Sequence, residues 1–452
     1  MDRSLAISLI REFEEEGLPD LVEREVPFVE PRSGKAVTII GPRRAGKTFF
    51  MFDIMKRNET DLNDILFLDL EDDRLYPPAT DDLDLFLRTH DEIRSDKVDG
   101  TKHIFFDEVQ MVPGWERFVR RILKEKRYRV YLTGSSSRLL AREIATTMRG
   151  RSLSYQILPF SFREAMKAGG SDLDTEPSPR KKTRLLGYLE SYLAYGGFPE
   201  VISEKDNGLK LRLLNDYVET MLLRDVIERN RVSNPKAMRV IMNGLISSFS
   251  KELSLKKYHG FLGTIGISIS KDQVYKYADH LMDAFMFFRL KKIGGGYRTV
   301  EQSMPKVYLI DNGIAAQYGL GFRENMGRYF ENALAVEMLR MTGWDPRLKV
   351  DYWKDPSGKE VDFVMKMGGR VISLIQACYD PKSENAGQRE VQALLKASEE
   401  LNCSDLRMIT WDSEEVMEIE GKRIEVLPIW RYLIQHPKDR IGVMLDGSSE
   451  NI

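Results

Sequence analysis

Short apolar runs alternate with amphipathic stretches over the first third of the chain. Gly, Pro or charged residues bound each apolar run, and the residues between the runs follow helical spacing. Strands that alternate with helices predict βαβ units and a mostly parallel sheet with helices on both faces, which is an α/β fold. The predicted strands are Ala36–Ile40, Asp64–Leu70, Lys102–Asp107, Arg129–Thr133 and Ser152–Leu158.

The pattern changes after residue 158. Helical spacing continues to about residue 290, with polar or Gly-rich breaks at 169–179 and 263–268 that predict loops. The helices expected here are Ser161–Lys167, Lys181–Tyr195, Leu209–Asn230 and Lys271–Arg289. From about residue 349 the sequence predicts the strands Lys349–Trp353, Val361–Met367, Val371–Tyr379 and Leu406–Thr410, and a helix near Glu390–Glu400.

The composition is that of a folded protein with several domains. A chain of 452 residues suggests about three domains of roughly 150 residues each. Hydrophobic residues make up 42% and charged residues 31%, so the chain can bury real cores. The 68 Lys and Arg nearly balance the 70 Asp and Glu, and the net charge of −2 excludes a globally basic nucleic-acid coat.

Cysteine content and hydropathy indicate the compartment. Cys378 and Cys403 cannot form a disulfide framework, and they fit a reducing environment. The N-terminal residues become acidic and amphipathic within the first dozen, unlike a signal peptide. No apolar run approaches the roughly 20 residues that span a bilayer. We therefore expect a soluble, cytoplasmic protein that does not enter a membrane.

A phosphate-binding loop is the strongest motif. It follows the predicted strand Ala36–Ile40 and precedes a helical run, Phe49–Lys56, which is the setting that lets backbone N–H groups and a helix N-terminus face phosphates. We expect Lys47 to reach the β- and γ-phosphates of ATP and Thr48 to bind Mg²⁺. An ordinary turn with a surface lysine is the alternative. The residues assigned to ATP are Gly41, Pro42, Arg43, Arg44, Ala45, Gly46, Lys47, Thr48 and Phe49.

Two carboxylates end the strand about 60 residues downstream. Asp107 is expected to hold Mg²⁺ through water, and Glu108 to polarise the attacking water. Taken alone, an Asp-Glu pair after a strand is a weak signal and fits a solvated acidic turn. Its place after a phosphate-binding loop favours the catalytic interpretation.

Polar residues after the next strand provide further candidates. Ser135 could contact the γ-phosphate or the lytic water. The alternative is that these polar residues only begin a helix, with Ser136 or Ser137 as its N-cap. Arg149 and Arg151 could project toward a γ-phosphate, and the one expected is that of a neighbouring subunit. The alternative for both arginines is to offset the dipole at a helix C-terminus.

Several segments resemble a known family. GPRRAGKT, FFDEVQ, LTGSSSRLLAREIA and GRSLSYQILPFSFREA are similar to segments of AAA-type ATPases of archaea and bacteria that carry a C-terminal domain of unassigned function. The resemblance covers roughly residues 20–435 and implies a P-loop core, 1–160, and a helical lid, 161–205. The sequence YGGFPE at 195–200 is similar to a lid motif whose proline packs on adenine, which implies an ATP contact for Pro199. Without the resemblance, this segment is only a tight break after a helix.

A winged-helix module is expected in residues 206–300, both from the resemblance and from a helix–turn–helix rhythm in 253–289. Residues 251–300 contain nine Lys or Arg against four Asp or Glu, which favours contact with the phosphates of duplex DNA. Asp272, Asp279 and Asp283 would repel phosphates, however. Packing between domains is therefore the alternative role.

Residues 301–452 resemble the restriction-endonuclease fold, whose site gathers Mg²⁺ on carboxylates beside a lysine. Asp362 matches the motif's first carboxylate and Glu331 could supply another. Gln376 stands at the second carboxylate position and Cys378 at the lysine position. We therefore expect a domain without nuclease activity that serves as a structural relic or binds a partner.

Together these features predict an ATPase switch. ATP with Mg²⁺ would bind between core and lid, and hydrolysis would change how the C-terminal modules meet a protein partner. A DNA-binding regulator stabilised by nucleotide is the main alternative, and a metal-dependent nuclease is the weaker one. An arginine that acts on another subunit would require a homo-oligomer.

Overall fold

The chain is described from a computed structural model. The described residues are 2–31, 34–94, 100–134, 148, 150–171, 173–294, 303–381 and 386–447. They divide into two compact units, one formed by residues 1–158 with 283–285 and the other by 159–282 with 286–452. None of the described helices is both long and apolar enough to cross a membrane.

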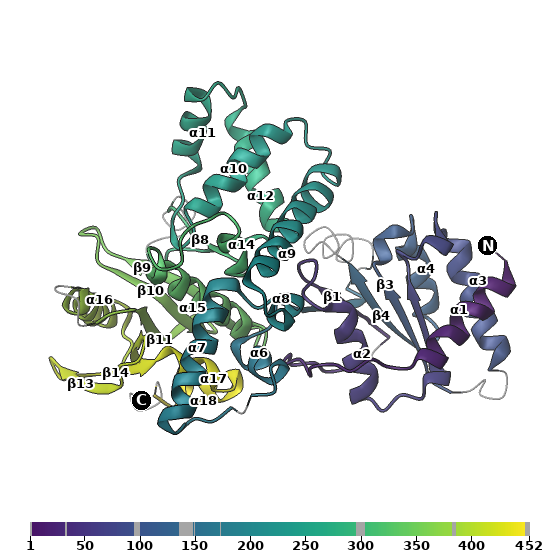
Figure 1. The fold of residues 1–452 in the computed structure, drawn as a ribbon, viewed down its shortest axis with the longest axis horizontal. Helices are drawn as coiled ribbons and strands as arrows, with labels where there is room; N and C mark the ends of the chain where they lie inside the picture. The colour runs from purple at the N-terminus through teal and green to yellow at the C-terminus, as the bar shows by residue number, and fades with distance from the viewer. Residues whose placement is uncertain are drawn as a thin grey trace. The chain divides into compact units, whose positions relative to one another are not determined.

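The first unit is an α/β layer structure built on a five-stranded parallel sheet in the order β2-β3-β4-β1-β5 (Figure 1). This confirms the predicted fold class, and each predicted strand is present within two residues at either end. The strands are β1 (Ala36–Ile40), β2 (Ile65–Asp69), β3 (Lys102–Asp107), β4 (Tyr128–Gly134) and β5 (Ser152–Gln156). The helices are α1 (Arg3–Glu16), α2 (Lys47–Arg57), α3 (Thr80–Ile93) and α4 (Trp115–Ile122), with short 3₁₀ turns at Leu62–Asp64, Asp73–Leu75 and Val109–Met111.

Helices cover both faces of this sheet. Alternate residues of β3 point to opposite sides, so Ile104 and Phe106 pack in the core with α1, α3 and α4, while Phe105 packs with α2. A strand that is buried on both faces must be apolar at successive positions. This requirement explains why a continuous apolar run, rather than strict alternation, marks β3 in the sequence.

The second unit begins with helices that lead into a small antiparallel sheet. The predicted helix over 209–230 is continuous, although its second half has π-helical hydrogen bonds. The sheet has the order β6-β8-β7. The helices are α6 (Phe162–Ala168), α7 (Pro179–Tyr195), α8 (Pro199–Ser203), α9 (Asn207–Thr220), the π-helix Met221–Glu228, α10 (Pro235–Ser247), α11 (Leu255–Thr264) and α12 (Lys271–Asp283). The strands are β6 (Lys251–Glu252), β7 (Phe287–Leu290) and β8 (Lys306–Leu309).

The predicted helix Lys271–Arg289 is wrong at its C-terminal end. α12 stops at Asp283, and Phe287–Leu290 is strand β7, paired with β8. Phe285 has a φ of 57°, in the left-handed region that ends a helix. The apolar run from Phe285 to Phe288 fits a helix face and a buried strand equally well, so periodicity could not decide between them.

A six-stranded mixed sheet forms the rest of the second unit, in the order β13-β14-β12-β11-β10-β9 (Figure 1). All four predicted strands and the predicted helix are present. The strands are β9 (Leu348–Lys354), β10 (Glu360–Met367), β11 (Arg370–Ala377), β12 (Leu406–Thr410), β13 (Glu415–Ile419) and β14 (Lys422–Pro428). The helices are α14 (Gly313–Ala316), α15 (Met326–Thr342), α16 (Ala386–Leu401), α17 (Ile429–Ile434) and α18 (Pro437–Gly447).

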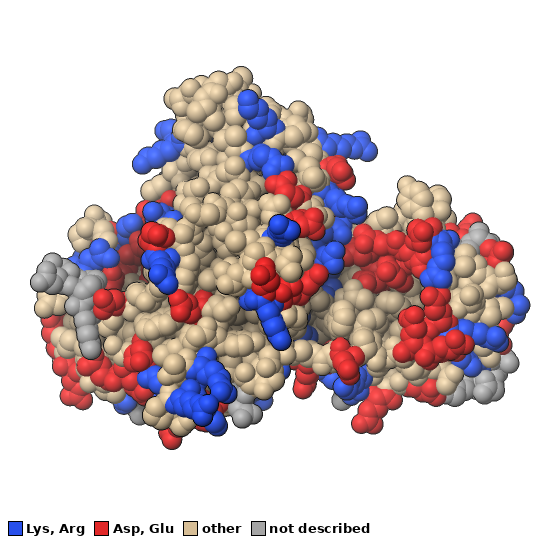
Figure 2. Space-filling view, viewed as in Figure 1, with Lys and Arg blue, Asp and Glu red and all other residues tan. Residues whose placement is uncertain are grey.

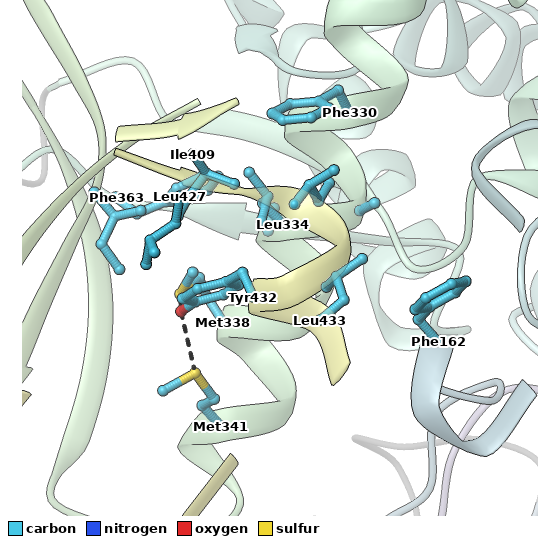
Figure 3. Close-up of a cluster of buried hydrophobic side chains, with 14 of the residues drawn as sticks. Phe162, Phe330, Leu334, Met338, Met341, Phe363, Ile409, Leu427, Tyr432 and Leu433 are labelled. Atoms are coloured by element: carbon cyan, nitrogen blue, oxygen red, sulfur yellow. Dashed lines mark hydrogen bonds between the residues drawn. The ribbon is translucent and has the colours of Figure 1, made fainter. Parts of the chain in front are cut away.

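One large core joins the mixed sheet to α6 and α7, the helices expected to form a lid. Buried side chains of α6 and α7 belong to the same cluster as those of α15, α17 and the sheet. Figure 3 shows part of this core, where Phe162 of α6, Leu334 of α15 and Leu433 of α17 surround one apolar interior. The hydroxyl of Tyr432 lies 3.8 Å from the sulfur of Met341. Residues 161–195 are thus packed as part of the second unit.

Candidate nucleotide site

Glycine conformations shape the phosphate-binding loop between β1 and α2. Gly41 has a φ of 154°, and a Cβ at this position would lie 2.0 Å from the carbonyl oxygen of Ile157. Gly46 has a φ of 90° and precedes the first residue of α2. Only glycine adopts such conformations without strain. The backbone therefore forms a cradle into which the N-terminus of α2 opens, which is the geometry that binds phosphate.

Lys47 lies inside this cradle. Its side chain is only 6% exposed, and its Nζ donates to the carbonyl oxygen of Pro42 at 3.1 Å. The same Nζ lies 4.0 Å from Oε1 of Glu108, at the end of β3. The ammonium group is thus placed between the loop and the carboxylate that the sequence predicts as the base.

Thr48 and Asp107 meet directly, although 59 positions separate them. The Thr48 hydroxyl donates to Oδ2 of Asp107 at 2.5 Å, and the Thr133 hydroxyl at the end of β4 donates to Oδ1. Burial and the charge of Glu108 raise the pKa of Asp107 to about 6, although the two hydroxyl hydrogen bonds oppose the rise. A hydroxyl and a carboxylate oxygen are hard ligands that suit Mg²⁺.

Glu108 is held in an unusual backbone conformation. Its φ of 52° is left-handed, which is uncommon for a residue other than glycine and concentrates at functional sites. Its N–H donates to the Thr133 hydroxyl at 2.9 Å, and Gln110 donates to its carboxylate. Thr133 therefore positions both acidic residues. The sequence indicated small hydroxyl residues at this strand end, but it pointed to Ser135, which lies outside the described residues.

Arg24 supports the loop and was missed in the sequence. It is 2% exposed, and its guanidinium donates to the carbonyl oxygens of Ala45 at 2.8 Å and Leu158 at 2.5 Å. Its backbone N–H donates to Asp53 at 3.2 Å. Arg24 precedes β1 in a segment without motif or regular structure, so no local pattern marks it.

The other predicted ATP contacts differ in their surroundings. Arg43 lies 3.6 Å from Glu71, Arg44 has a φ of 62°, and Phe49 is 49% exposed. The exposed Phe49 and the two arginines lie at the start of α2 or just before it, where a bound nucleotide could reach them.

Arg151, one of the two predicted arginine candidates, lies at the opposite end of β1 from the phosphate-binding loop. Arg151 directly precedes β5, and its carbonyl oxygen accepts from Ala36 N–H at the first residue of β1. The phosphate-binding loop follows the last residue of β1, about 16 Å away along five strand residues. Arg151 therefore cannot reach its own loop. Arg149 lies outside the described residues.

The Gly-Gly-Phe-Pro segment is anchored within the second unit by Asp311. The N–H groups of Gly197 and Gly313 donate to the two carboxylate oxygens of Asp311 at 2.7 and 2.8 Å. Burial raises the pKa of Asp311 to about 6 despite these bonds. Pro199 is partly buried as the first residue of α8. Its predicted contact with adenine stays a prediction.

The residues of the nuclease-like pattern also come together. Glu331 of α15 and Asp362 of β10 both contact Lys306, and Gln376 of β11 donates to Asp362 at 2.8 Å. Burial raises the pKa of the Cys378 thiol to about 11, so it carries no charge near neutral pH. Lys306 was missed because it lies on β8, far from the motif in the sequence.

Comparisons with known proteins agree with this geometry. A family described as AAA domain matches residues 33–166, and two domains of unknown function match residues 186–325 and 326–432. The uncharacterized protein MJ1544 of Methanocaldococcus jannaschii is 35% identical over 408 residues, covering 89% of each chain. This chain belongs to the MJ1544 family. An uncharacterized protein of Haemophilus influenzae is 28% identical over 407 residues, covering 88% of this chain and 94% of its own.

Solved structures share little more than a general likeness with this MJ1544 relative. Cdc6p from Pyrobaculum aerophilum has a TM-score of 0.26 and 9% identity, covering 56% of this chain and 80% of its own. AMPPCP-bound DnaA from Aquifex aeolicus has a TM-score of 0.23 and 14% identity, covering 62% and 87%. Scores this low support no functional comparison. The AAA domain and the phosphate-binding loop themselves support a nucleotide-binding, ATPase-like role.

Proposed function

We propose that this member of the MJ1544 family binds ATP with Mg²⁺ and hydrolyses it. The observation that carries the proposal is the direct hydrogen bond from Thr48 to Asp107. It joins the phosphate-binding loop to the acidic end of β3, so that the groups needed to hold a phosphate-bound cation are adjacent before any ligand binds.

Each residue has a distinct role in the proposed reaction. The loop N–H groups and Lys47 hold the β- and γ-phosphates, while Thr48 and Asp107 hold the cation. When bound, Mg²⁺ neutralises the charge that develops between the phosphates. Glu108 accepts a proton from the attacking water. Asp107 must be ionised to bind a cation, and a nearby cation favours that form.

Replacing the base separates binding from turnover. We expect Glu108→Gln to bind ATP as the wild type does and to lose about 10²-fold or more in turnover, since a general base contributes about that much. Nucleotide binding is measured by calorimetry and phosphate release by a coupled assay. Unchanged turnover in this variant would exclude Glu108 as the base.

Two further variants control this experiment. Glu125→Gln makes the same chemical change at an exposed residue of the same unit that pairs with Arg127, and it should leave both readouts unchanged. Lys47→Ala should lose ATP binding itself. If Lys47→Ala binds ATP as tightly as the wild type, the loop is not the nucleotide site.

We further propose that nucleotide state controls the C-terminal modules. The Gly-Gly-Phe-Pro segment supports this idea because Asp311 accepts hydrogen bonds both from Gly197 of this segment and from Gly313, the first residue of α14. A nucleotide contact at Pro199 would then act on an element that is packed with the partner-binding modules. Limited proteolysis of residues 206–452 should differ between ATP-bound and ADP-bound Glu108→Gln protein.

Duplex DNA binding by residues 251–300 is the second candidate. The element order α10-β6-α11-α12-β7-β8, with a β6-β8-β7 sheet, favours a winged-helix module. Figure 2 shows blue Lys and Arg side chains scattered over the region of α10–α12 on this face, with uncharged areas between them. Arg289 is paired with Asp279 at 2.9 Å, which reduces its availability to phosphate.

Salt dependence tests this candidate. Neutralising the exposed Lys256, Lys257 and Lys271 together should weaken duplex binding and flatten its dependence on salt concentration. A wild-type chain that binds no duplex at low salt would exclude the DNA-binding role, and the module would then serve packing or a protein partner.

A further inference from the structure

A single buried lysine lies at the centre of the nuclease-like residues. Lys306 on β8 is 3% exposed, and its Nζ lies 2.8 Å from Glu331, 2.8 Å from Asp362 and 2.5 Å from Glu360. An ammonium group has three N–H donors, so each can serve one of these carboxylates. The three acceptors come from α15 and from two positions of β10.

The second oxygen of Asp362 is also occupied. The Gln376 amide donates to it at 2.8 Å and the Ala377 N–H at 3.0 Å. The same Gln376 amide nitrogen donates to Glu390 of α16 at 2.6 Å. Asp362 therefore accepts hydrogen bonds on both oxygens, and a metal ion shared by Asp362 and Glu331 would have to displace the Lys306 ammonium.

The ammonium is charged in this setting. Burial by itself would lower the pKa of Lys306, but Asp362 and Glu331 outweigh it and hold the pKa well above its ordinary value. Burial and the neighbouring Asp362 raise the pKa of Glu331 to about 7, while Lys306 and the Tyr308 hydroxyl oppose that rise. Three carboxylates around one point need a positive charge at that point.

We propose that the Lys306 ammonium takes the place of a divalent cation, so that this carboxylate site is closed by a cation of the chain itself. Carboxylate oxygens converging on one point are the ligand set that Mg²⁺ and Mn²⁺ prefer. In this chain the point is filled by Nζ, and among the described residues no group of His, Cys, Asp and Glu stands ready to hold a metal. The inference does not depend on ATP hydrolysis.

The charge also has a structural consequence. Lys306 belongs to the small sheet, whereas Asp362 and Glu360 belong to the mixed sheet. The Lys306 ammonium is covalently part of β8, so it links the two sheets permanently. A metal ion would link them only while it was bound. This domain would keep the carboxylates of a metal site and use them to fix β8.

Removing the Lys306 ammonium should open the carboxylate site to a metal ion. We expect Lys306→Ser to gain Mn²⁺ binding in nucleotide-free protein, and Asp362→Asn in the same background to remove that gain. In the wild-type chain, Asp362→Asn should leave the Mn²⁺ titration unchanged. Mn²⁺ binding is measured by electron paramagnetic resonance, and an upward shift of the Lys306→Ser unfolding temperature with Mn²⁺ gives a second readout.

A neighbouring lysine provides the matched control. Lys354 contacts Glu360 at 3.1 Å and Glu252 at 3.0 Å but is more exposed and lies at the edge of the cluster. Lys354→Ser should gain no Mn²⁺ site. Wild-type binding of Mn²⁺ that depends on Asp362, or Mn²⁺-dependent cleavage of DNA that Asp362→Asn abolishes, would overturn the proposal and make Lys306 a lysine of an open metal site.

A measurement on the wild type covers the case in which Lys306→Ser does not fold. Lysine acetylation read by mass spectrometry should leave Lys306 unmodified, with or without Mn²⁺, because its ammonium stays buried. Exposed Lys256 in the same protein reports that the reagent is active. Labelling of Lys306 that rises when Mn²⁺ is added would show that the metal displaces the ammonium, and would overturn the proposal.

Discussion

At the scale of single residues, the buried Asp107 opposes the stability of the fold at neutral pH. Asp107 is 5% exposed, and its pKa is raised from 3.8 to about 6. A raised carboxyl pKa means that the folded chain binds the proton more tightly than the unfolded chain. Stability from this group is therefore present at acidic pH and is lost as pH rises from about 4 through 6.

The loss of stability at rising pH leads to a prediction for Asp107→Asn. The amide keeps the size of the side chain and removes the buried charge, so at pH 7 we expect the nucleotide-free variant to be more stable than the wild type by up to about 2–3 kcal/mol. The difference should disappear near pH 4. Amide hydrogen exchange in β1 and β3 measures this difference in stability locally. A variant that is less stable than the wild type at pH 7 would contradict the prediction.

At this scale the sequence predicts a residue when a local motif marks it. The loop glycines, Lys47 and Thr48 stand in one run, and Asp107-Glu108 follow an apolar strand that parallel topology returns to the same sheet edge. Arg24 and Lys306 have no such mark, because their roles arise from contacts across 21 to 134 positions and 25 to 56 positions. A buried lysine in a short strand cannot be told from a solvated one without the fold.

At the scale of elements, the turn between α7 and α8 requires a glycine, because a residue with a Cβ would clash there. Gly196 has a φ of 80°, and a Cβ there would lie 1.7 Å from a carboxylate oxygen of Asp311 and 2.7 Å from the backbone nitrogen of Gly313. Both atoms are fixed by the hydrogen bond that joins them. The clash therefore cannot be relieved by turning a free side chain.

We expect Gly196→Ala to destabilise the second unit by about 2–4 kcal/mol, the range of strain and overpacking combined. Gly187→Ala is the control, because Gly187 lies inside α7 with no atom within 4 Å of an added Cβ. That change should be neutral or stabilising by up to about 1 kcal/mol. Denaturant unfolding followed by circular dichroism compares the two, and equal effects would show that Asp311 does not restrict Gly196.

Elements were predictable where one periodicity stood out. The strands of the parallel sheet and the helix α16 follow from their patterns. The pattern predicts the end of a helix where the structure has β7, and it does not predict β13 and β14. The role of α6 and α7 shows a different limit. Their amphipathic faces predict burial, but only the structure shows that Phe162 and Leu189 join the core of the mixed sheet.

For the molecule as a whole, Arg151 raises the question of assembly. Its position at the N-terminal edge of the parallel sheet places it about 16 Å or more from the phosphate-binding loop of the same chain, as the strand rise requires. If Arg151 stabilises a γ-phosphate, that phosphate belongs to another copy. We therefore predict that ATP turnover per chain rises with protein concentration and that Arg151→Ala alone is impaired.

Mixing two inactive chains distinguishes this role from helix capping. Glu108→Gln retains Arg151 but lacks the base, while Arg151→Ala retains the base. If the arginine acts between copies, the mixture should recover turnover that neither variant shows alone, because a Glu108→Gln chain can supply its arginine to an Arg151→Ala neighbour. Arg149→Ala is assayed in the same way, and Arg180→Ala, at the exposed start of α7, is the control. Full turnover by Arg151→Ala at every concentration would assign Arg151 to capping, whereas impaired turnover without recovery on mixing would contradict catalysis between copies.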